Sequence, residues 1–291
     1  PDVSLVSAPG GTFVGGNRVG PASAPAAVAQ GSAFLTVRST TKLFSDASKT
    51  QLNRLHAVAA PAGRDVLIGG GAQVNRDSVH AITSRLPLVL ALIGVITFVL
   101  LFLLTGSLVL PLKALVLNML SLSAAFGALV WIFQEGHLNA LGTTPTGTLE
   151  ANMPVLLFCI AFGLSMDYEV FLVSRIREYW LASAQTRDDN DESVALGLAR
   201  TGRDVTATAS IMAIAFAALI AAQVSFMRIF GLGLTLAVLV DATLVRMALL
   251  PAFMHVMGRW NWWAPKPLAR LHARVGFSEE PPEPARDPVG V

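Results

Sequence analysis

The sequence predicts a membrane all-α protein, a five-helix transmembrane bundle that is preceded by part of an extracytoplasmic α+β domain. Of its 291 residues, 53% are hydrophobic and only 14% are charged, whereas soluble domains carry about 25% charged residues. The apolar residues collect in long runs after Leu86, and the earlier part of the chain has an ordinary mixture. A lipid-facing body joined to a soluble segment explains this distribution best.

Residues 1–85 are the predicted soluble segment. The part up to residue 33 is rich in Gly, Pro, Ser and Ala without periodicity, so it is predicted to be a loop. Periodic patterns then predict four elements: a strand at 33–38, a helix at 45–60 with Asp46 as its cap, a strand at 65–68, and a helix at 74–85 that runs into the membrane. A strand–helix–strand unit of this size is typical of a small α+β domain.

Five apolar runs follow, and they define a transmembrane domain over 86–252. Each run approaches or exceeds the ~20 residues that cross a ~30 Å hydrocarbon core as a helix. The predicted spans are 86–105, 109–133, 152–173, 204–222 and 229–250.

The distribution of Lys and Arg predicts how the chain crosses the membrane. The connection at 174–203 and the tail at 253–291 are rich in basic residues, whereas the loop at 134–151 has none. Because basic residues are retained in the cytoplasm, we expect a multi-pass protein of the plasma (inner) membrane, with residues 1–85 extracytoplasmic and the C-terminus cytoplasmic. Arg246, near the end of the last span, is expected to extend its side chain to the cytoplasmic surface.

The cytoplasmic parts carry three further patterns. Trp260, Trp262 and Trp263 follow the last span and are expected at the membrane interface. An apolar patch at 193–198, beside acidic residues, predicts a short helix along the membrane surface. The Pro- and charge-rich end at 279–291 is expected to be disordered.

Several function classes lack the residues that they require. The basic residues form no stripe with interleaved aromatics, so no nucleic-acid partner is expected. Cys159 is the only cysteine, and the five histidines are scattered without metal-ligand spacing. No nucleophile, base or phosphate-binding loop has its required context, so we expect no enzyme, metal or cofactor. Because the chain begins with Pro1 and shows no signal peptide, we expect a fragment that follows an upstream membrane helix.

Two aspartates lie inside predicted spans. Asp167, followed by Tyr168, lies in the third span, and Asp241 lies near the middle of the fifth. A central aspartate costs about 2.5–3.5 kcal/mol on an insertion scale, so it needs a hydrated cavity, a partner or a proton. Because a low-dielectric site disfavours the charged form of a carboxyl group, such a group can take up and release protons, and a tyrosine hydroxyl can partner either state. A purely structural role stays open for both aspartates.

Helical geometry predicts which side chains share a face with Asp167. Gly163 and Ser174 fall on the same face, and Gly163 would permit a close neighbour. Tyr168 points about 100° away, so it is expected to contact different partners, and Glu169 cannot share the contact of Asp167.

Small and hydroxylated residues line the fourth span. Ala209, Ala213 and Ala217 repeat every four residues, which favours tight helix packing. Thr206 and Ser210 run beside them, where each can bond a carboxyl group across the bundle or a carbonyl of its own helix.

Two long segments resemble a known family. FGLSMDYEVFLVSRIRE at 162–178 resembles the third-last span of the mycobacterial membrane protein large (MMPL) family, within the resistance-nodulation-division (RND) superfamily. GLGLTLAVLVDATLVRMALLPA at 231–252 is similar to the last span of that family. The resemblance implies the C-terminal half of a transporter built from two homologous halves, in which residues 1–85 are the tail of a porter-like domain.

In the family, an Asp–Tyr pair in each half contributes to a proton relay, and Asp167 with Tyr168 matches the second-half pair. Asp241, Thr206, Ser210 and Ser174 are candidates for supporting polar roles. The implied function is proton-coupled export of lipids or other hydrophobic molecules across the plasma membrane. The implied partners are membrane lipids, the hydrophobic substrate and the missing N-terminal half, and a homo-oligomer stays open.

An alternative function belongs to another class. The chain could be a membrane scaffold or sensor, whose extracytoplasmic domain binds a ligand or partner without transport. The two functions differ in whether Asp167 faces a hydrated cavity or only a packed helix.

Overall fold

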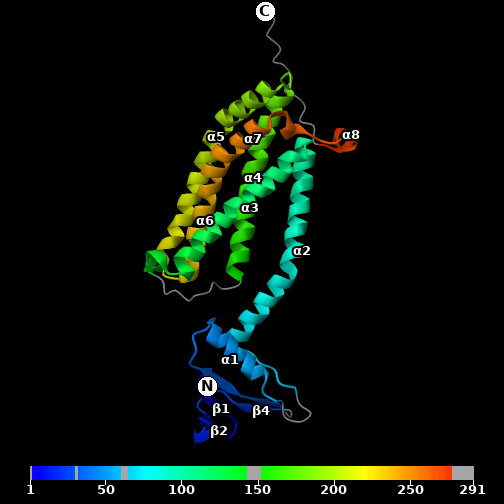
Figure 1. Cartoon of the computed structure of the whole chain (residues 1–291). Coiled ribbons are helices and arrows are strands. Elements are labelled where there is room, and N and C mark those ends of the chain that lie inside the picture. Colours follow the sequence, from blue (N-terminus) through cyan, green and yellow to red (C-terminus); the bar gives the residue numbers. More distant parts are fainter. Residues whose placement is uncertain (1, 30–31, 60–64, 143–151, 277–291) are drawn as a thin grey trace, which may run out of the picture. The chain divides into compact units, whose positions relative to one another are not determined.

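A computed structural model describes residues 2–29, 32–59, 65–142 and 152–276 (Figure 1). The chain divides into two compact units. The N-terminal unit comprises Pro1–Ser84 with Phe133–Asn152, and the helical unit comprises Arg85–Ile132 with Met153–Val291.

The N-terminal unit contains antiparallel strands where the sequence predicts a loop. Four of them form one sheet in the order β3-β2-β1-β6, and two short strands form a separate hairpin. The strands are β1 (Val3–Ala8), β2 (Gly11–Val14), β3 (Asn17–Gly20), β4 (Ala27–Ala29), β5 (Ser32–Phe34) and β6 (Thr36–Ser39). The prediction of a loop up to residue 33 is therefore wrong.

The glycines of this segment are turn residues that allow the sheet to form. Gly15 and Gly16 connect β2 to β3, and both have positive φ, 56° and 87°. A two-residue hairpin loop with positive φ at both positions matches the right-handed twist of the flanking strands. The same glycines that suggested a loop thus make a tight hairpin.

The N-terminal unit also contains the predicted helix but not the second predicted strand. Helix α1 (Asp46–His56) forms inside the predicted 45–60, but its cap is Ser45, whose hydroxyl accepts a hydrogen bond from the Ser48 backbone N–H at 3.2 Å. Asp46 lies in the first turn instead, where Lys49 donates to its carboxylate at 2.8 Å and lowers the pKa of Asp46. Residues 65–68 are irregular, so the second predicted strand is wrong.

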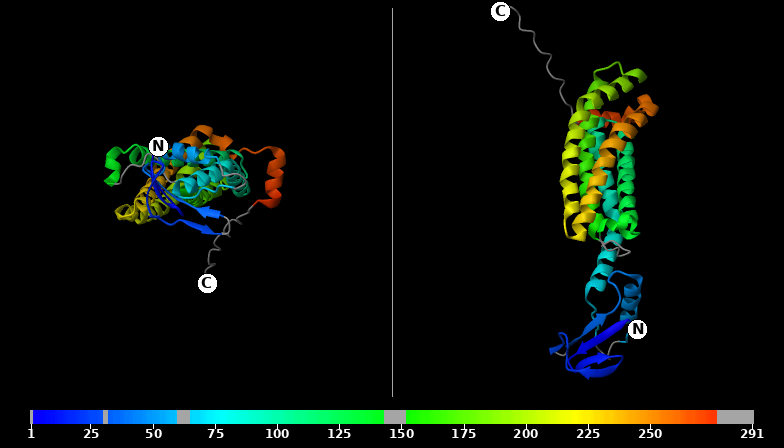
Figure 2. Two further views of the ribbon diagram at one scale, coloured as in Figure 1. Left: turned by 90° about the horizontal axis from the view of Figure 1, so that it is seen from below. Right: turned by 90° about the vertical axis from the view of Figure 1, so that its left-hand side faces the viewer.

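Five helices are long and apolar enough to cross a membrane, which confirms the predicted bundle (Figure 2). They include α2 (Gly71–Thr105), α3 (Val109–Leu129) continued by η1 (Val130–Gln134), α4 (Asn152–Leu181), and α5 (Arg187–Ala218) continued by η3 (Leu219–Ala221). The fifth consists of α6 (Ser225–Val240), η4 (Asp241–Leu249), α7 (Leu250–Met257) and η5 (Gly258–Trp262). The remaining helices are η2 (His137–Gly142) and α8 (Lys266–Val275).

The fourth crossing helix begins much earlier than predicted. Helix α5 starts at Arg187, with Thr186 and Asp189 forming a reciprocal capping box. Residues 193–198 lie inside this helix, and Ser193 and Gly197 are buried. The predicted separate surface helix is therefore wrong. The segment 279–291, which was expected to be disordered, lies outside the described residues.

A buried polar cluster joins the end of the last crossing helix to the starts of α3 and α5. The amide of Asn261 donates to the carbonyls of Met254 and Gly258, each at 2.7 Å. Trp262 donates from Nε1 to Asn190 Oδ1 at 3.1 Å, and its ring stacks on Trp180 with centroids 5.2 Å apart. Trp262 is therefore half-buried against its neighbours, whereas Trp260 and Trp263 are exposed. The position of the three tryptophans at the membrane interface stays a prediction.

Helix packing at Gly197 is tight enough to test. A Cβ at this position would lie 2.6 Å from Ile176 Cγ1 and 3.2 Å from the Ile176 Cα of α4. Overpacking costs about 1–3 kcal/mol, which outweighs the gain in helix propensity of about 1 kcal/mol. We expect Gly197→Ala to lower the thermal unfolding midpoint of the detergent-purified protein. Gly127→Ala, whose Cβ would meet no atom within 4 Å, is the matched control and should not lower the midpoint; equal loss in both variants would contradict this packing.

Candidate functional site

The most buried charged side chain in the helical unit is Arg246, on η4. Its exposed fraction is 0%, so the expectation that it extends to the cytoplasmic surface is wrong. The reason is the backbone of η4, which is a nine-residue π-helix. In an α-helix, residues five apart point about 140° away from each other, but the i→i+5 bonding of a π-helix aligns them. Asp241 and Arg246 are five apart and therefore share one face.

These two residues form a close ion pair in the bundle interior. Arg246 Nε donates to Asp241 Oδ2 at 2.8 Å, and Asp241 is 5% exposed. Ser165 of α4 donates from its hydroxyl to Asp241 Oδ1 at 2.8 Å, and its carbonyl and hydroxyl oxygens accept from Arg246 Nη2. Through Ser165, the ion pair thus links the last crossing helix to α4 by hydrogen bonds.

Tyr168 contacts the same arginine from α4. The Arg246 guanidinium carbon lies 5.4 Å from the centroid of the Tyr168 ring, within the range of a cation–π interaction. The Tyr168 hydroxyl donates to the sulfur of Met212, on α5, at 2.8 Å. Tyr168 therefore lies between the buried ion pair and the fourth crossing helix.

Asp167 lies on the opposite side of α4 from this network. Asp167 is exposed, and no hydrogen bond or ion pair joins its side chain to any part of the chain that the structure describes. Gly163 shares its outward face, and a Cβ there would meet no atom of the described residues within 4 Å, so Gly163 has no close neighbour among them. Ser174 donates to the Phe171 carbonyl of its own helix at 3.2 Å. The structure thus separates Asp167 from Asp241.

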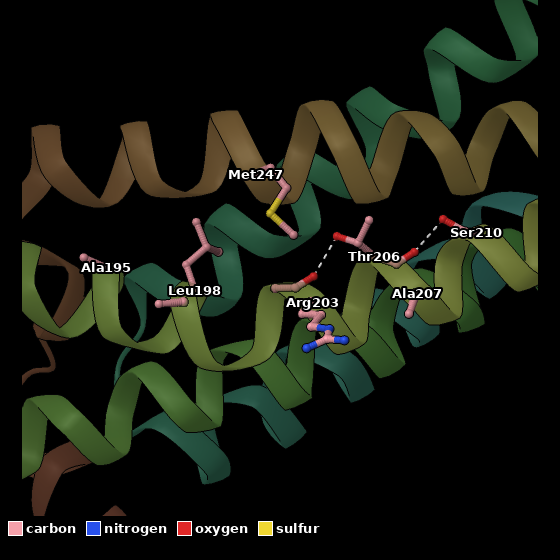
Figure 3. Close-up of a pocket in the computed structure, with 9 residues that line it drawn as sticks. Ala195, Leu198, Arg203, Thr206, Ala207, Ser210 and Met247 are labelled. Atoms are coloured by element: carbon pink, nitrogen blue, oxygen red, sulfur yellow. Dashed lines mark hydrogen bonds between the residues drawn. The ribbon is translucent and has the colours of Figure 1, made fainter.

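Thr206 and Ser210 also stay apart from the carboxyl groups. Their hydroxyls donate to their own helix, to the carbonyls of Gly202 and Thr206 at 2.6 and 2.7 Å (Figure 3). They line a groove of about 780 Å³ on the surface of α5, together with Ala195, Leu198, Ala199, Gly202, Arg203, Ala207 and Met247. Of the two alternatives for these hydroxyls, the geometry shows the bond to their own helix.

The alanines of α5 pack on the last crossing helix. Ala209 and Ala213 are buried and form one cluster with Val238 and Ala242, and Ala217 is half-buried. This close approach holds α5 against the segment where η4 begins.

Sequence reasoning missed two further buried ionisable residues. Lys113 of α3 is 8% exposed and Glu169 of α4 is 2% exposed. Glu169 Oε2 lies 3.7 Å from Arg246 Nη1. Both residues fall inside predicted spans, and that position alone could have identified them, because ionisable residues in spans are costly.

Comparison with known proteins finds one matching family and several similar membrane proteins. The sequence pattern of the MMPL family matches residues 26–280. A putative membrane protein of Streptomyces coelicolor is 47% identical over 224 residues, which are 77% of this chain and 31% of that protein. The trehalose monomycolate exporter MmpL3 of Mycobacterium tuberculosis is 41% identical over 236 residues, 81% of this chain and 24% of the exporter.

The heme uptake protein MmpL11 of the same species is 37% identical over 235 residues, 81% of this chain and 23% of that protein. The chain thus spans between about a quarter and a third of the length of these relatives.

The buried ion pair predicts a strong effect of removing Arg246. Arg246→Met would leave Asp241 and Glu169 buried without their cation, and breaking a buried pair costs about 3–5 kcal/mol. We expect the purified full-length protein to lose most of its folded fraction, measured by thermal unfolding in detergent. The control is Arg175→Met, because Arg175 pairs with Glu178 at 2.7 Å but is 43% exposed, where such pairs contribute about 0–1 kcal/mol. Similar midpoints for the two variants would contradict the assignment.

Proposed function

The chain belongs to the MMPL family, and from that premise we propose that it is part of a secondary active transporter in the plasma membrane. The transporter uses the proton-motive force to export lipids or other hydrophobic molecules. Two of the relatives are named as a trehalose monomycolate exporter and a heme uptake protein, and this supports a large hydrophobic cargo.

The observation that carries the proposal is the position of Asp167. A carboxyl group in the middle of a crossing helix points away from its own bundle and has no partner among the described residues. An ionisable group at this depth needs a partner, water or a proton. The N-terminal half of the transporter, which this chain does not contain, would supply the facing surface. Asp167 and Tyr168 would then form the second-half part of a proton relay between the two halves.

The neighbouring network gives the relay a physical means of acting on the bundle. Tyr168 contacts Arg246 through its ring and Met212 of α5 through its hydroxyl. A change of charge at Asp167 alters the field at this tyrosine, one residue away. A proton that crosses the membrane releases about 2.3 kcal/mol per 100 mV, which is enough to shift the balance between two conformations.

The proposed orientation follows the basic residues. The turn between α4 and α5 and the end of the chain around α8 would lie in the cytoplasm, and the N-terminal unit would lie outside. Protons would then enter from the side of the N-terminal unit and leave near the α4–α5 turn.

Replacing the carboxyl group tests the proposal. We expect Asp167→Asn in the full-length transporter, reconstituted in vesicles, to lose at least about 90% of gradient-driven export of a fluorescent lipid, because general acid–base groups contribute 10²-fold or more when proton transfer is required. Proton flux coupled to the lipid should fall in parallel.

Asp188→Asn, an exposed aspartate in the first turn of α5, serves as the matched control and should keep wild-type export. Wild-type coupling in Asp167→Asn would remove the relay. A wild-type protein that binds ligand on its N-terminal unit but moves neither lipid nor protons would favour the scaffold or sensor function instead.

A further inference from the structure

A second carboxyl group on α4, Glu169, lies on the face opposite to Asp167. The two residues are separated by about 200° around the helix axis. Asp167 is exposed on the outside of the chain, and Glu169 points into the bundle, 2% exposed. The relay proposed above makes no use of this buried acid.

The groups around Glu169 leave its charge incompletely compensated. Arg246 Nη1 lies 3.7 Å from Glu169 Oε2, whereas Arg246 Nε pairs with Asp241 more closely, at 2.8 Å. Glu169 Oε1, Lys113 Nζ and Arg246 Nη1 are all buried and have no hydrogen-bond partner among the described residues. The cluster holds two acids, Asp241 and Glu169, and two bases, Lys113 and Arg246. Such buried polar atoms without partners are rare and each one calls for an explanation.

A narrow, partly open gap next to Glu169, called the void below, indicates where solvent could reach it. This gap lies between α2, α3 and α4 and is too narrow to hold a water molecule. Besides Glu169, its walls are Leu101, Thr105, Leu110, Pro111, Ala114 and Val173, none of which titrates. The void lies where α2 ends and α3 begins, so a small separation of these helices would hydrate Glu169 from the end of the bundle that carries this turn.

We propose that Glu169 and Lys113 form a second proton-binding site, distinct from the Asp167–Tyr168 pair, that exchanges its proton through the void at the α2–α3 turn. The inference rests on the proposed proton-coupled transport and deepens it. The Glu169 carboxylate takes up one proton from water to become a neutral acid, and it returns that proton to water when the void opens. Lys113 and Arg246 keep their protons throughout.

Electrostatics explains why occupancy by a proton would move the helices. Ionised Glu169 attracts Lys113 of α3 and Arg246 of η4 across a low-dielectric interior, which holds the three elements together and keeps the void closed. Protonation removes this attraction and leaves Lys113 as a buried cation without a counter-charge, which strongly favours hydration. The charged groups that interact electrostatically with Glu169 are Arg246, Lys113 and Asp241, and Tyr168 lies beside it on α4. Opening of the α2–α3 end therefore follows proton uptake.

Infrared difference spectroscopy can detect this proton directly in the wild-type protein. Full-length protein, labelled with ¹³C at the glutamate carboxyl groups and reconstituted in lipid, would be compared between acidic and alkaline buffer. We expect a protonated carboxyl band of a buried glutamate that shows the isotope shift. Absence of any such glutamate band in the folded wild-type protein would overturn the proposal, and this measurement needs no variant.

Substitutions assign the band. It should disappear in Glu169→Gln and persist in Glu178→Gln, the half-exposed glutamate on the same helix. Lys113→Gln should move the band toward alkaline pH by about 1–3 pH units, because an opposite charge nearby favours the ionised acid by that amount. Lys266→Gln, at the start of α8, should leave it unchanged. A band that survives Glu169→Gln, or an unchanged titration in Lys113→Gln, would overturn the proposal.

Transport measurements separate this inference from the proposed function. If the wild-type protein exports lipid under a proton gradient and Glu169→Gln retains the wild-type pH profile, the second site is wrong and the relay at Asp167 stands. If Glu169→Gln reduces the change of the export rate with pH at least about tenfold, and Glu169→Asp restores part of that change, the site is supported. If the wild-type protein shows no gradient-driven export, the proposed function fails, and the infrared band alone decides whether Glu169 binds a proton.

Discussion

The helical unit depends on the neutralisation of one buried cation, Arg246. A guanidinium group inside a membrane-spanning bundle carries a desolvation penalty of several kcal/mol that only close ion pairing can offset. Asp241 provides that pairing at 2.8 Å, and it can do so because η4 is π-helical and brings residues five apart onto one face. The irregular backbone and the buried pair therefore explain each other. Ser165, which donates to Asp241 and accepts from Arg246, and the ring of Tyr168 then link α4 to this ion pair.

This arrangement gives α4 two chemically different faces. The inward face carries Ser165 and Glu169, which contact the charged residues of η4. The outward face carries Asp167, for which the described chain offers no partner. In the proposed mechanism, each face of this helix thus carries one acid that binds a proton. Tyr168, between the faces, contacts Arg246 of η4 and Met212 of α5.

The sequence predicted the parts of this structure that depend on length and composition. Five long apolar runs specify five crossing helices because a helix satisfies its backbone hydrogen bonds within one segment, and each run has the length that crosses the hydrocarbon core. The prediction from the sequence was wrong where the local backbone geometry departs from a regular pattern. The Gly15–Gly16 pair predicts a loop unless its hairpin geometry is considered. Arg246 is predicted to be a surface residue if the helix is assumed to be regular. Lys113 and Glu169 could have been identified from the sequence as candidate buried charges, because both lie in predicted spans. Their interaction could not be predicted, because it depends on how the helices pack.

The coupling free energy between Asp241 and Arg246 tests the central claim most directly. It can be measured by a double-mutant cycle with Asp241→Asn, Arg246→Met and the double variant, using unfolding of the full-length protein in mild detergent. A buried, hydrogen-bonded pair predicts a coupling within the range of about 0.5–3 kcal/mol found for contacting residues, near its upper end. Additive effects of the two substitutions, with no coupling, would contradict the view that this ion pair holds the bundle together.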